Sequence, residues 1–336
     1  MSSSDARCVR GASRLRNRLP EALGYEAMHR RFLRVSALVM LLMPGAAGAQ
    51  LTYSSGQSVS PAFEGWWQND DRTYTLFFGY MNDNWAEELD VPIGPDNRIE
   101  PGGPDRGQPS HFLPRRNMFL FEVQVPADFG DQELVWTLTT HGTTHRAYAS
   151  LRTDYLVDKQ VIGTEVGANR GGVSQDWQWN EPPEVTLGVD QRRRVRVGEG
   201  LPLVAFATDA DGIPSSTKAG VTLRPSTPRT RSERHPAYRR PQQVVPGSPN
   251  GLRLSWFVYR GAGDVTFEPP QMKVWQDTRP YANSPWSPPF EIPPVPPDGK
   301  WEAVAIFEEP GTYVLRALAS DGALFTAQDV IVTVTP

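Results

Sequence analysis

Hydrophobic and polar positions alternate with a period of two along most of this chain. The segment TYTLFFGYMN places four large side chains on one face: Tyr74, Leu76, Phe78 and Tyr80. This period is typical of a β-strand with one buried face. No window of a dozen residues shows the 3.6-residue apolar period of an amphipathic helix, and proline interrupts most candidate segments. The pattern predicts an all-β protein in which helix is scarce.

The same alternation recurs twice more in the first half of the chain. The segment MFLFEVQV has one apolar face made of Phe119, Phe121, Val123 and Val125. The segment ELVWTLTTHGTTHRAYASL contains two apolar-polar runs that meet at His141-Gly142-Thr143, and the first run has Leu134, Trp136 and Leu138 on one face. Two runs joined by a short glycine-containing break predict a β-hairpin.

The last 36 residues predict a second hairpin. Every second residue from Tyr313 is apolar, Ser320-Asp321-Gly322 forms a turn signal, and a run of alternating valines ends the chain: Val330, Val332 and Val334. A Tyr at the start of the penultimate strand matches the tyrosine corner of immunoglobulin-like sandwiches. We therefore expect two antiparallel immunoglobulin-like β-sandwich domains in tandem.

The length of 336 residues fits two such domains. The expected organisation is an extension over 1–27, a signal peptide over 28–49, a first sandwich over 50–158, a linker over 159–182, and a second sandwich over 183–336 with an insertion at 213–250.

The segment from Met28 to Ala49 has the three parts of a secretory signal. Three arginines precede an apolar run over residues 35–43, and Ala47-Gly48-Ala49 offers small residues before the cleavage point. We expect export and cleavage before Gln50. Met28 is then the expected start of translation, and residues 1–27 are either spurious or a genuine extension.

Cleavage changes what the remaining chain can do. The one cysteine, Cys8, is lost, so the mature chain has neither a disulfide nor a thiolate ligand or nucleophile. The net charge falls from −4 to −9, because residues 1–49 hold eight Arg and three acidic residues. An acidic exported protein with no transmembrane segment is not expected to bind nucleic acid.

Motifs of the second half resemble those of a PKD domain or a cadherin-like relative. They are FEEPGTYVLRALASDG with the terminal VIVTV, the upstream ATDADG, and the strand LSWFV that contains Trp256. The resemblance covers residues 183–336 apart from the insertion. It implies an immunoglobulin-like fold, with PGTY and SDG in structural roles.

The first half resembles a β-sandwich module of bacterial exported and cell-surface proteins. Four motifs occur in order over about residues 60–155: FFGYMNDN, VPIGPDNRIEP, DRGQPSHFLPRRN and LVWTL. Arg115-Arg116 departs from the Gly-Arg expected there. The resemblance implies an accessory or structural domain.

The long polar segment 89–117 is expected to be an ordered connection, since its six prolines stiffen it and its glycines permit turns. The alternative is a hard-cation site built from four carboxylates: Asp90, Asp96, Glu100 and Asp105.

Asp209 and Asp211 form a second candidate calcium site, because two carboxylates in an Asp-x-Asp-Gly turn can converge on one ion. A solvated turn is the favoured interpretation. His141 and His145 flank a hairpin turn, but the sequence suggests no third zinc ligand beside them.

Two proline-rich segments suggest partners. The basic insertion, with Arg229, Arg231, Arg234, Arg239 and Arg240, is expected to be a solvated loop, and the alternative is contact with an anionic envelope polymer or partner. Exposed aromatic rings could stack on sugars, and the candidates are Trp66, Trp67, Tyr281 and Trp286. The favoured interpretation of residues 278–301 is instead a proline-aromatic strap that packs on the sandwich.

No nucleophile elbow, HExxH motif or P-loop occurs. We expect a non-catalytic structural or interaction module that is periplasmic, cell-surface or extracellular, with an envelope polysaccharide or another envelope protein as its partner. No cofactor is expected other than calcium. The alternatives are a carbohydrate-binding protein that uses surface Trp residues and a hydrolase of undetected type.

The order of basic, apolar and small residues from Met28 to Ala49 predicts a mature form that begins at Gln50. N-terminal sequencing of exported protein measures this directly. An intact Met1 on protein that stays in the cytoplasm would contradict the prediction.

Overall fold

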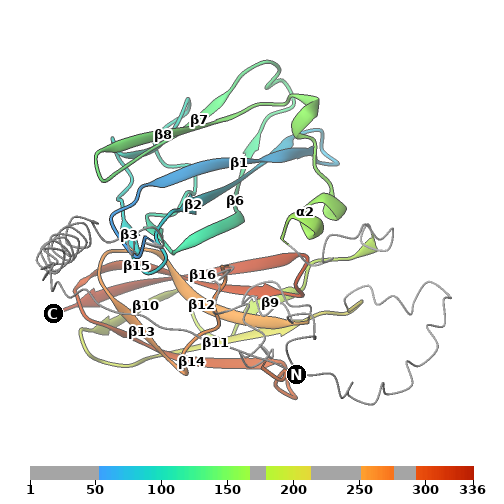
Figure 1. Cartoon of the computed structure of the whole chain (residues 1–336). Helices are drawn as coiled ribbons and strands as arrows, with labels where there is room; N and C mark the ends of the chain where they lie inside the picture. The colour runs from blue at the N-terminus through green and yellow to red at the C-terminus, as the bar shows by residue number, and fades with distance from the viewer. Residues whose placement is uncertain (1–52, 167–178, 213–250, 276–292) are drawn as a thin grey trace, which may run out of the picture. The chain divides into compact units, whose positions relative to one another are not determined.

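The computed structural model describes residues 53–166, 179–212, 251–275 and 293–336. The residues from Tyr53 to Pro336 belong to one compact unit. Strands dominate this unit, as Figure 1 shows, and they form two antiparallel, immunoglobulin-like β-sandwiches in tandem. The predicted signal peptide and the basic insertion lie outside the described residues.

The first sandwich contains three small sheets. One has the order β1-β2-β6, the second β4-β7-β8, and the third pairs β3 with β5. The strands are β1 (Val59–Gln68), β2 (Tyr74–Asn82), β3 (Leu89–Asp90), β4 (Asn97–Glu100), β5 (His111–Phe112), β6 (Arg115–Val125), β7 (Leu134–Thr140) and β8 (Thr143–Ala149).

The second sandwich packs the sheet β10-β16-β15-β12 against the sheet β13-β14-β11-β9. Its strands are β9 (Glu184–Leu187), β10 (Arg192–Arg196), β11 (Leu201–Thr208), β12 (Arg253–Arg260), β13 (Val265–Glu268), β14 (Lys300–Phe307), β15 (Gly311–Ser320) and β16 (Phe325–Thr335). The pairs are antiparallel except β10 with β16, which run parallel.

The predicted apolar faces of β2 and β7 form the core of the first sandwich. Leu76, Phe78 and Tyr80 are buried there together with Trp136, which is fully enclosed. Phe78 stacks on Phe121 with ring centroids 5.2 Å apart. The hairpin between β7 and β8 also forms where predicted, and His141 and Gly142 both adopt positive φ values of 48° and 73°.

One face prediction is wrong. Phe119 does not join Phe121 in the first core but lies in a separate apolar cluster with Phe77. The cause is an irregularity in the β2–β6 pairing between Phe78 and Tyr80, opposite which Phe119 has a φ of 51°. A bulge of this kind turns a side chain to the opposite face of the sheet.

The second core contains the predicted residues of the terminal hairpin. Tyr313, Leu315, Ala317 and the alternating valines of β16 are fully or almost fully buried around Trp256. The Tyr313 hydroxyl donates to the carbonyl of Glu309 (3.0 Å) and to that of Ala262. Bonding to a carbonyl four residues upstream is the geometry of a tyrosine corner.

Helix is scarce in the described residues. The 3₁₀ helix η2 (Thr153–Tyr155) follows β8, and the helix α2 (Lys159–Glu165) begins after Asp158, whose carboxylate accepts from the Val161 amide. In the part of the chain that the structure describes, no helix has the length and apolar character needed to cross a bilayer.

The segment 89–117 is an ordered connection, as expected, and Asn97 is its internal support. The Asn97 amide donates to the carbonyls of Val91 (2.9 Å) and Pro109 (2.8 Å), and its Oδ1 accepts from the Trp136 indole (3.0 Å). The side chain is fully buried. It therefore satisfies two loop carbonyls and a core indole that would otherwise be buried without partners.

Strand β12 joins the two sandwiches because both of its faces are buried. Leu254, Trp256 and Val258 face the second core, whereas Phe257 and Tyr259 pack into the core of the first sandwich. The Tyr259 hydroxyl donates to the Gly107 carbonyl. The first core thus includes side chains from a strand of the second sandwich.

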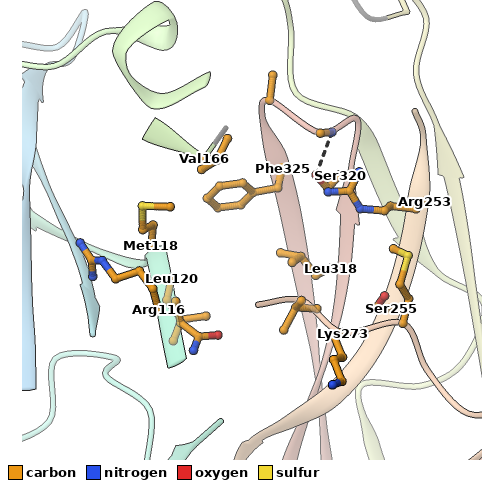
Figure 2. Close-up of a pocket in the computed structure, with 15 residues that line it drawn as sticks. Arg116, Met118, Leu120, Val166, Arg253, Ser255, Lys273, Leu318, Ser320 and Phe325 are labelled. Atoms are coloured by element: carbon orange, nitrogen blue, oxygen red, sulfur yellow. Dashed lines mark hydrogen bonds between the residues drawn. The ribbon is translucent and has the colours of Figure 1, made fainter. Parts of the chain in front are cut away.

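A further apolar cluster, which we call the junction core, lies between the sandwiches. Its buried members are Phe77, Phe119, Val157, Ile162, Ala323 and Leu324. They come from β2, β6, the segment between η2 and α2, α2 itself, and the turn between β15 and β16. Beside this cluster, in Figure 2, Met118 and Leu120 face Leu318 and Phe325 across a cavity of about 80 Å³.

Replacement of Asn97 by Ala should lower the free energy of unfolding by about 3 kcal/mol, because three buried polar groups lose their partner at once. Chemical denaturation measures this loss. Asp96→Ala is the matched control, since that neighbouring side chain is exposed. Equal stabilities of the two variants would show that the loop does not depend on Asn97.

Candidate metal centre

Three carboxylates from two turns gather at one end of the second sandwich. Asp209 and Asp211 follow β11, in a turn that Gly212 completes with a φ of 64°, and Asp321 lies in the turn between β15 and β16. We call them the junction carboxylates, because the Asp321 turn also supplies Ala323 and Leu324 to the junction core. The sequence predicted the first two as a pair and assigned Asp321 to turn formation alone.

Asp321 holds its own turn in shape. Its Oδ1 accepts from the backbone amides of Ala323 (2.6 Å) and Leu324 (2.8 Å), and the residue is fully buried. The Asp321 carbonyl also accepts from the amide of Gly251 (2.7 Å). Its turn-forming role is therefore confirmed, and its second oxygen faces the segment that precedes β9.

That preceding segment brings Asn180 and Glu181 to the carboxylates. Asn180 Nδ2 donates to Asp321 Oδ2 (2.7 Å), and the Glu181 amide donates to Asp211 Oδ2 (3.0 Å). Asn180 is fully buried, yet its Oδ1 has no hydrogen-bond partner. The arrangement joins three segments that are far apart in the sequence.

Asp209 differs from a solvated turn residue. It is half-buried, and its Oδ1 is a buried atom without a partner. Burial, the neighbouring carboxyl of Asp211 and the charge of Asp321 raise the pKa of Asp209 to about 6. Crowded carboxylates favour either a bound proton or a bound cation.

One guanidinium lies near this group. Arg253 at the start of β12 is buried, and burial lowers its pKa to about 10 although the charge of Asp321 opposes that shift. Arg253 therefore offsets part of the negative charge at Asp321.

Carboxylates alone do not complete a metal site here. Within the described residues, no three His, Cys, Asp or Glu side chains are grouped so that they could hold one ion. Calcium also accepts amide and backbone carbonyl oxygens and water, at 2.3–2.6 Å. Asp209, Asp211 and the unpaired Asn180 Oδ1 are the side-chain oxygens that suit such an ion.

The carboxylates of segment 89–117 are engaged elsewhere. Asp105 forms a two-pronged ion pair with Arg260 (2.8 and 3.0 Å), and Glu100 pairs with Arg98 (2.8 Å). Asp90 bonds to His111 (2.8 Å). These three carboxylates bond to three different side chains, and Asp96, the fourth predicted ligand, is exposed.

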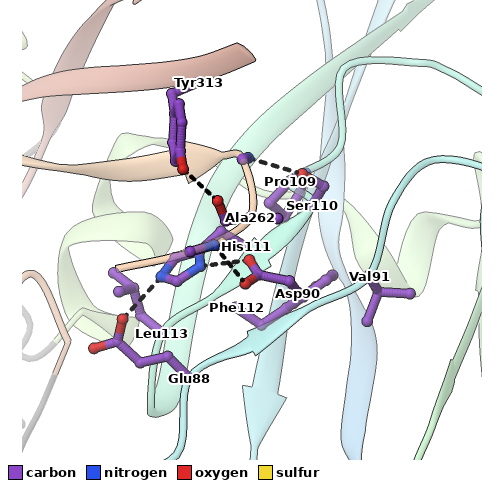
Figure 3. A network of polar contacts seen from close by, with 12 residues as sticks. Glu88, Asp90, Val91, Pro109, Ser110, His111, Phe112, Leu113, Ala262 and Tyr313 are labelled. Atoms are coloured by element: carbon purple, nitrogen blue, oxygen red, sulfur yellow. Dashed lines mark hydrogen bonds and ion pairs between the residues drawn. The ribbon is translucent and has the colours of Figure 1, made fainter. Parts of the chain in front are cut away.

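Figure 3 shows that His111 is held between two carboxylates. Its Nδ1 bonds to Asp90 and its Nε2 to Glu88, both at 2.8 Å, while Asp90 Oδ2 also accepts from the amide of Gly263 (3.4 Å). Burial by itself would lower the pKa of His111, but the hydrogen bonds to Asp90 and Glu88 raise it to about 9. These ion pairs fix Asp90, which in turn bonds to Gly263 of the second sandwich.

Trp66 and Trp67 occupy opposite faces of β1. The Trp66 indole donates to the Arg152 carbonyl (2.8 Å) and its ring meets Tyr74 edge-on at 5.6 Å. The Trp67 ring meets Phe77 edge-on at 4.5 Å. Both rings are half-buried, and the structure does not bring them into one platform.

Other predicted contact residues lie outside the described residues. These are Tyr281 and Trp286 of the aromatic segment, and the insertion residues Arg229, Arg231, Arg234, Arg239 and Arg240. His141 and His145 have separate partners, Glu87 (3.2 Å) and the Ser58 hydroxyl (2.9 Å).

Comparisons with known proteins leave the family open. No family model matches the chain, and no curated protein matches it either. Among solved structures, the chain is similar to a chimeric titin Z1Z2 that carries a decorin peptide, with 10% identity, 83% of this chain and 99% of that chain covered, and a TM-score of 0.21.

Two further structures are similarly distant. The D0-D1 domain of intimin has 9% identity, covers 82% of this chain and 97% of its own, and has a TM-score of 0.21. The eight N-terminal Ig domains of Down Syndrome Cell Adhesion Molecule have 8% identity and a TM-score of 0.22, with 82% of this chain and 27% of that chain covered. The immunoglobulin-like fold of this protein rests on its own strand order.

The His111 network predicts a loss of stability at alkaline pH. Because the pKa of His111 rises from 6.5 in the unfolded chain to about 9 in the folded protein, its contribution is complete below pH 6.5 and disappears as pH rises through 9. Because solvent partly screens the two carboxylates, the expected loss in the free energy of unfolding is on the order of 2 kcal/mol. Urea denaturation between pH 6 and 9.5 measures it.

His111→Gln should flatten this pH dependence. His145→Gln is the control, because His145 bonds to a hydroxyl and not to a carboxylate. A stability profile that is unchanged by His111→Gln would contradict the assignment.

Proposed function

We propose that this protein is an exported, non-catalytic structural and interaction module whose C-terminal sandwich binds calcium at the junction carboxylates. Its partner is an envelope polysaccharide or another envelope protein at a periplasmic, cell-surface or extracellular location. The signal-like segment that ends at Ala49 supports export. The net negative charge of the chain after cleavage argues against a nucleic-acid partner.

The calcium site is carried by two buried oxygens that lack partners. Asp209 Oδ1 and Asn180 Oδ1 are both enclosed without a hydrogen bond, and Asp211 and Asp321 add negative charge beside them. Buried polar atoms are rarely left unsatisfied, and each one without a partner costs about 1–3 kcal/mol. A hard cation would bind both oxygens, and backbone carbonyls and water would complete its six to eight ligands.

The non-catalytic role is supported by how the polar side chains are used. Asp90 and Glu88 bond to His111, and Asp105 pairs with Arg260. These contacts connect separate segments of the chain. Two pockets lie beside the described residues, and neither is lined by Asp209 or Asp211. Carbohydrate binding and hydrolysis stay as alternative hypotheses.

Calcium should raise the melting temperature, because an ion that binds only the folded state stabilises it by mass action. At 100 times the dissociation constant the gain is about 2.7 kcal/mol, or on the order of 5 °C for a protein of this size. Thermal unfolding with calcium and with a chelator measures the shift.

Asp209→Asn should abolish most of the shift while it keeps the shape of the side chain. Asp190→Asn is the matched control, since Asp190 is an exposed aspartate of the same sandwich. The calcium proposal fails if the wild-type protein melts at the same temperature with calcium and with chelator.

A further inference from the structure

We infer that calcium at the junction carboxylates fixes the two sandwiches to each other, so that ion binding and docking of the sandwiches are energetically coupled. This inference rests on the proposed calcium site and adds that the bound ion stabilises the contact between the two sandwiches. It follows from two paths of direct contacts that connect the site to the junction core.

The first path runs through the turn between β15 and β16. Asp321 Oδ2 accepts a hydrogen bond from the side-chain amide of Asn180, and Asp321 Oδ1 accepts from the backbone amides of Ala323 and Leu324. Ala323 and Leu324 are 1% and 6% exposed within the junction core. Any change that orders Asn180 and Asp321 therefore orders the residues that fill the space between the sandwiches.

The second path runs through the segment before β9 and the helix α2. The Glu181 amide donates to Asp211, and the Glu181 carboxylate pairs with Lys159 (2.7 Å) at the start of α2. Ile162 on the same helix is 3% exposed in the junction core. The acidic end of the second sandwich is thus connected to both sides of that core.

Both paths end on side chains of the first sandwich. Phe77 of β2 and Phe119 of β6 belong to the same junction core as Leu324 of the turn and Ile162 of the helix. If the sandwiches separate, Leu324 and Ile162 lose this apolar contact, and the turn and α2 become free to move. The ion would then have to order Asn180 and Asp211 by itself, at a cost in conformational entropy.

Coupling of this kind is reciprocal, because the free energy that links two equilibria is the same in both directions. A change that weakens the junction core must weaken calcium binding, even where it touches no ligand. Conversely, calcium must slow the opening of the junction. Neither effect is expected from a calcium site that stabilises only its own turn.

The test uses Leu324→Ala in the whole mature protein, with the calcium dissociation constant measured by isothermal titration calorimetry. We expect affinity to fall about fivefold or more, the lower end of typical coupling. Leu134→Ala is the matched control, since Leu134 is 2% exposed in the core of the first sandwich and lies outside the junction core. It should destabilise the protein but leave the affinity unchanged.

A second measurement covers the case in which Leu324→Ala does not fold. Hydrogen exchange of the wild-type amides of Ala323, Leu324 and Ile162 should slow at least fivefold when calcium is added. Amides of β7 should slow only by the factor that corresponds to the increase in global stability. Leu324→Val, a milder change, should weaken calcium binding by a smaller factor.

The outcomes separate the two proposals. If the wild-type protein does not bind calcium, the proposed site is wrong and the coupling with it. If calcium binds, but Leu324→Ala and Leu324→Val bind it as tightly as the wild type and exchange at Ala323 and Leu324 is unchanged, the site stands and the coupling is wrong. Equal weakening by Leu134→Ala would also overturn the coupling.

Discussion

The guanidinium of Arg316 is the interaction on which the arrangement of the two sandwiches depends. It forms a two-pronged ion pair with Asp329 of the neighbouring strand (2.8 and 2.9 Å), donates to the Leu120 carbonyl of the first sandwich (2.9 Å), and lies 3.4 Å from the centre of the Tyr259 ring. Its side chain is only 12% exposed. A charge this deeply placed costs several kcal/mol in desolvation, so each of these contacts is needed to hold it there.

This constraint explains why so much polar sequence in the first half is structural. Tyr259 can lie under Arg316 because its hydroxyl is bonded to the Gly107 carbonyl and Arg260 is paired with Asp105, both in segment 89–117. The loop is in turn fixed internally by Asn97 and by the His111 network. Segment 89–117 resembles an active-site loop in the sequence, but in the structure it contacts the second sandwich and helps to hold it in place.

The sequence could predict each sandwich but not their junction. Alternation in β2, β7, β15 and β16 identified the core residues, and the PGTY motif located the tyrosine corner, because these features depend on local periodicity. The orientation of Phe119 was predicted wrongly, since a bulge is set by the partner strand. The signal for the junction was present in LSWFVY, a run of apolar residues on both faces of one strand, which is typical of a strand buried on both sides.

The candidate site was half predicted for a similar reason. The Asp-x-Asp-Gly spacing identified Asp209 and Asp211, which are two residues apart. Asn180 and Asp321 are 141 residues apart in the sequence and meet only in the folded second sandwich. No local sequence pattern identifies such a pair. The sequence therefore predicted a solvated turn, whereas contacts made only in the fold leave Asp209 half-buried.

Native-state hydrogen exchange shows most directly whether the two sandwiches unfold globally as one cooperative unit. Exchange is measured at increasing urea for backbone amides of β7 in the first sandwich and β14 in the second. We expect both sets to reach the same free energy of opening with the same dependence on urea, because Arg316 and β12 connect the two cores. A lower opening free energy and a smaller urea dependence for either sandwich alone would show instead that each sandwich unfolds independently.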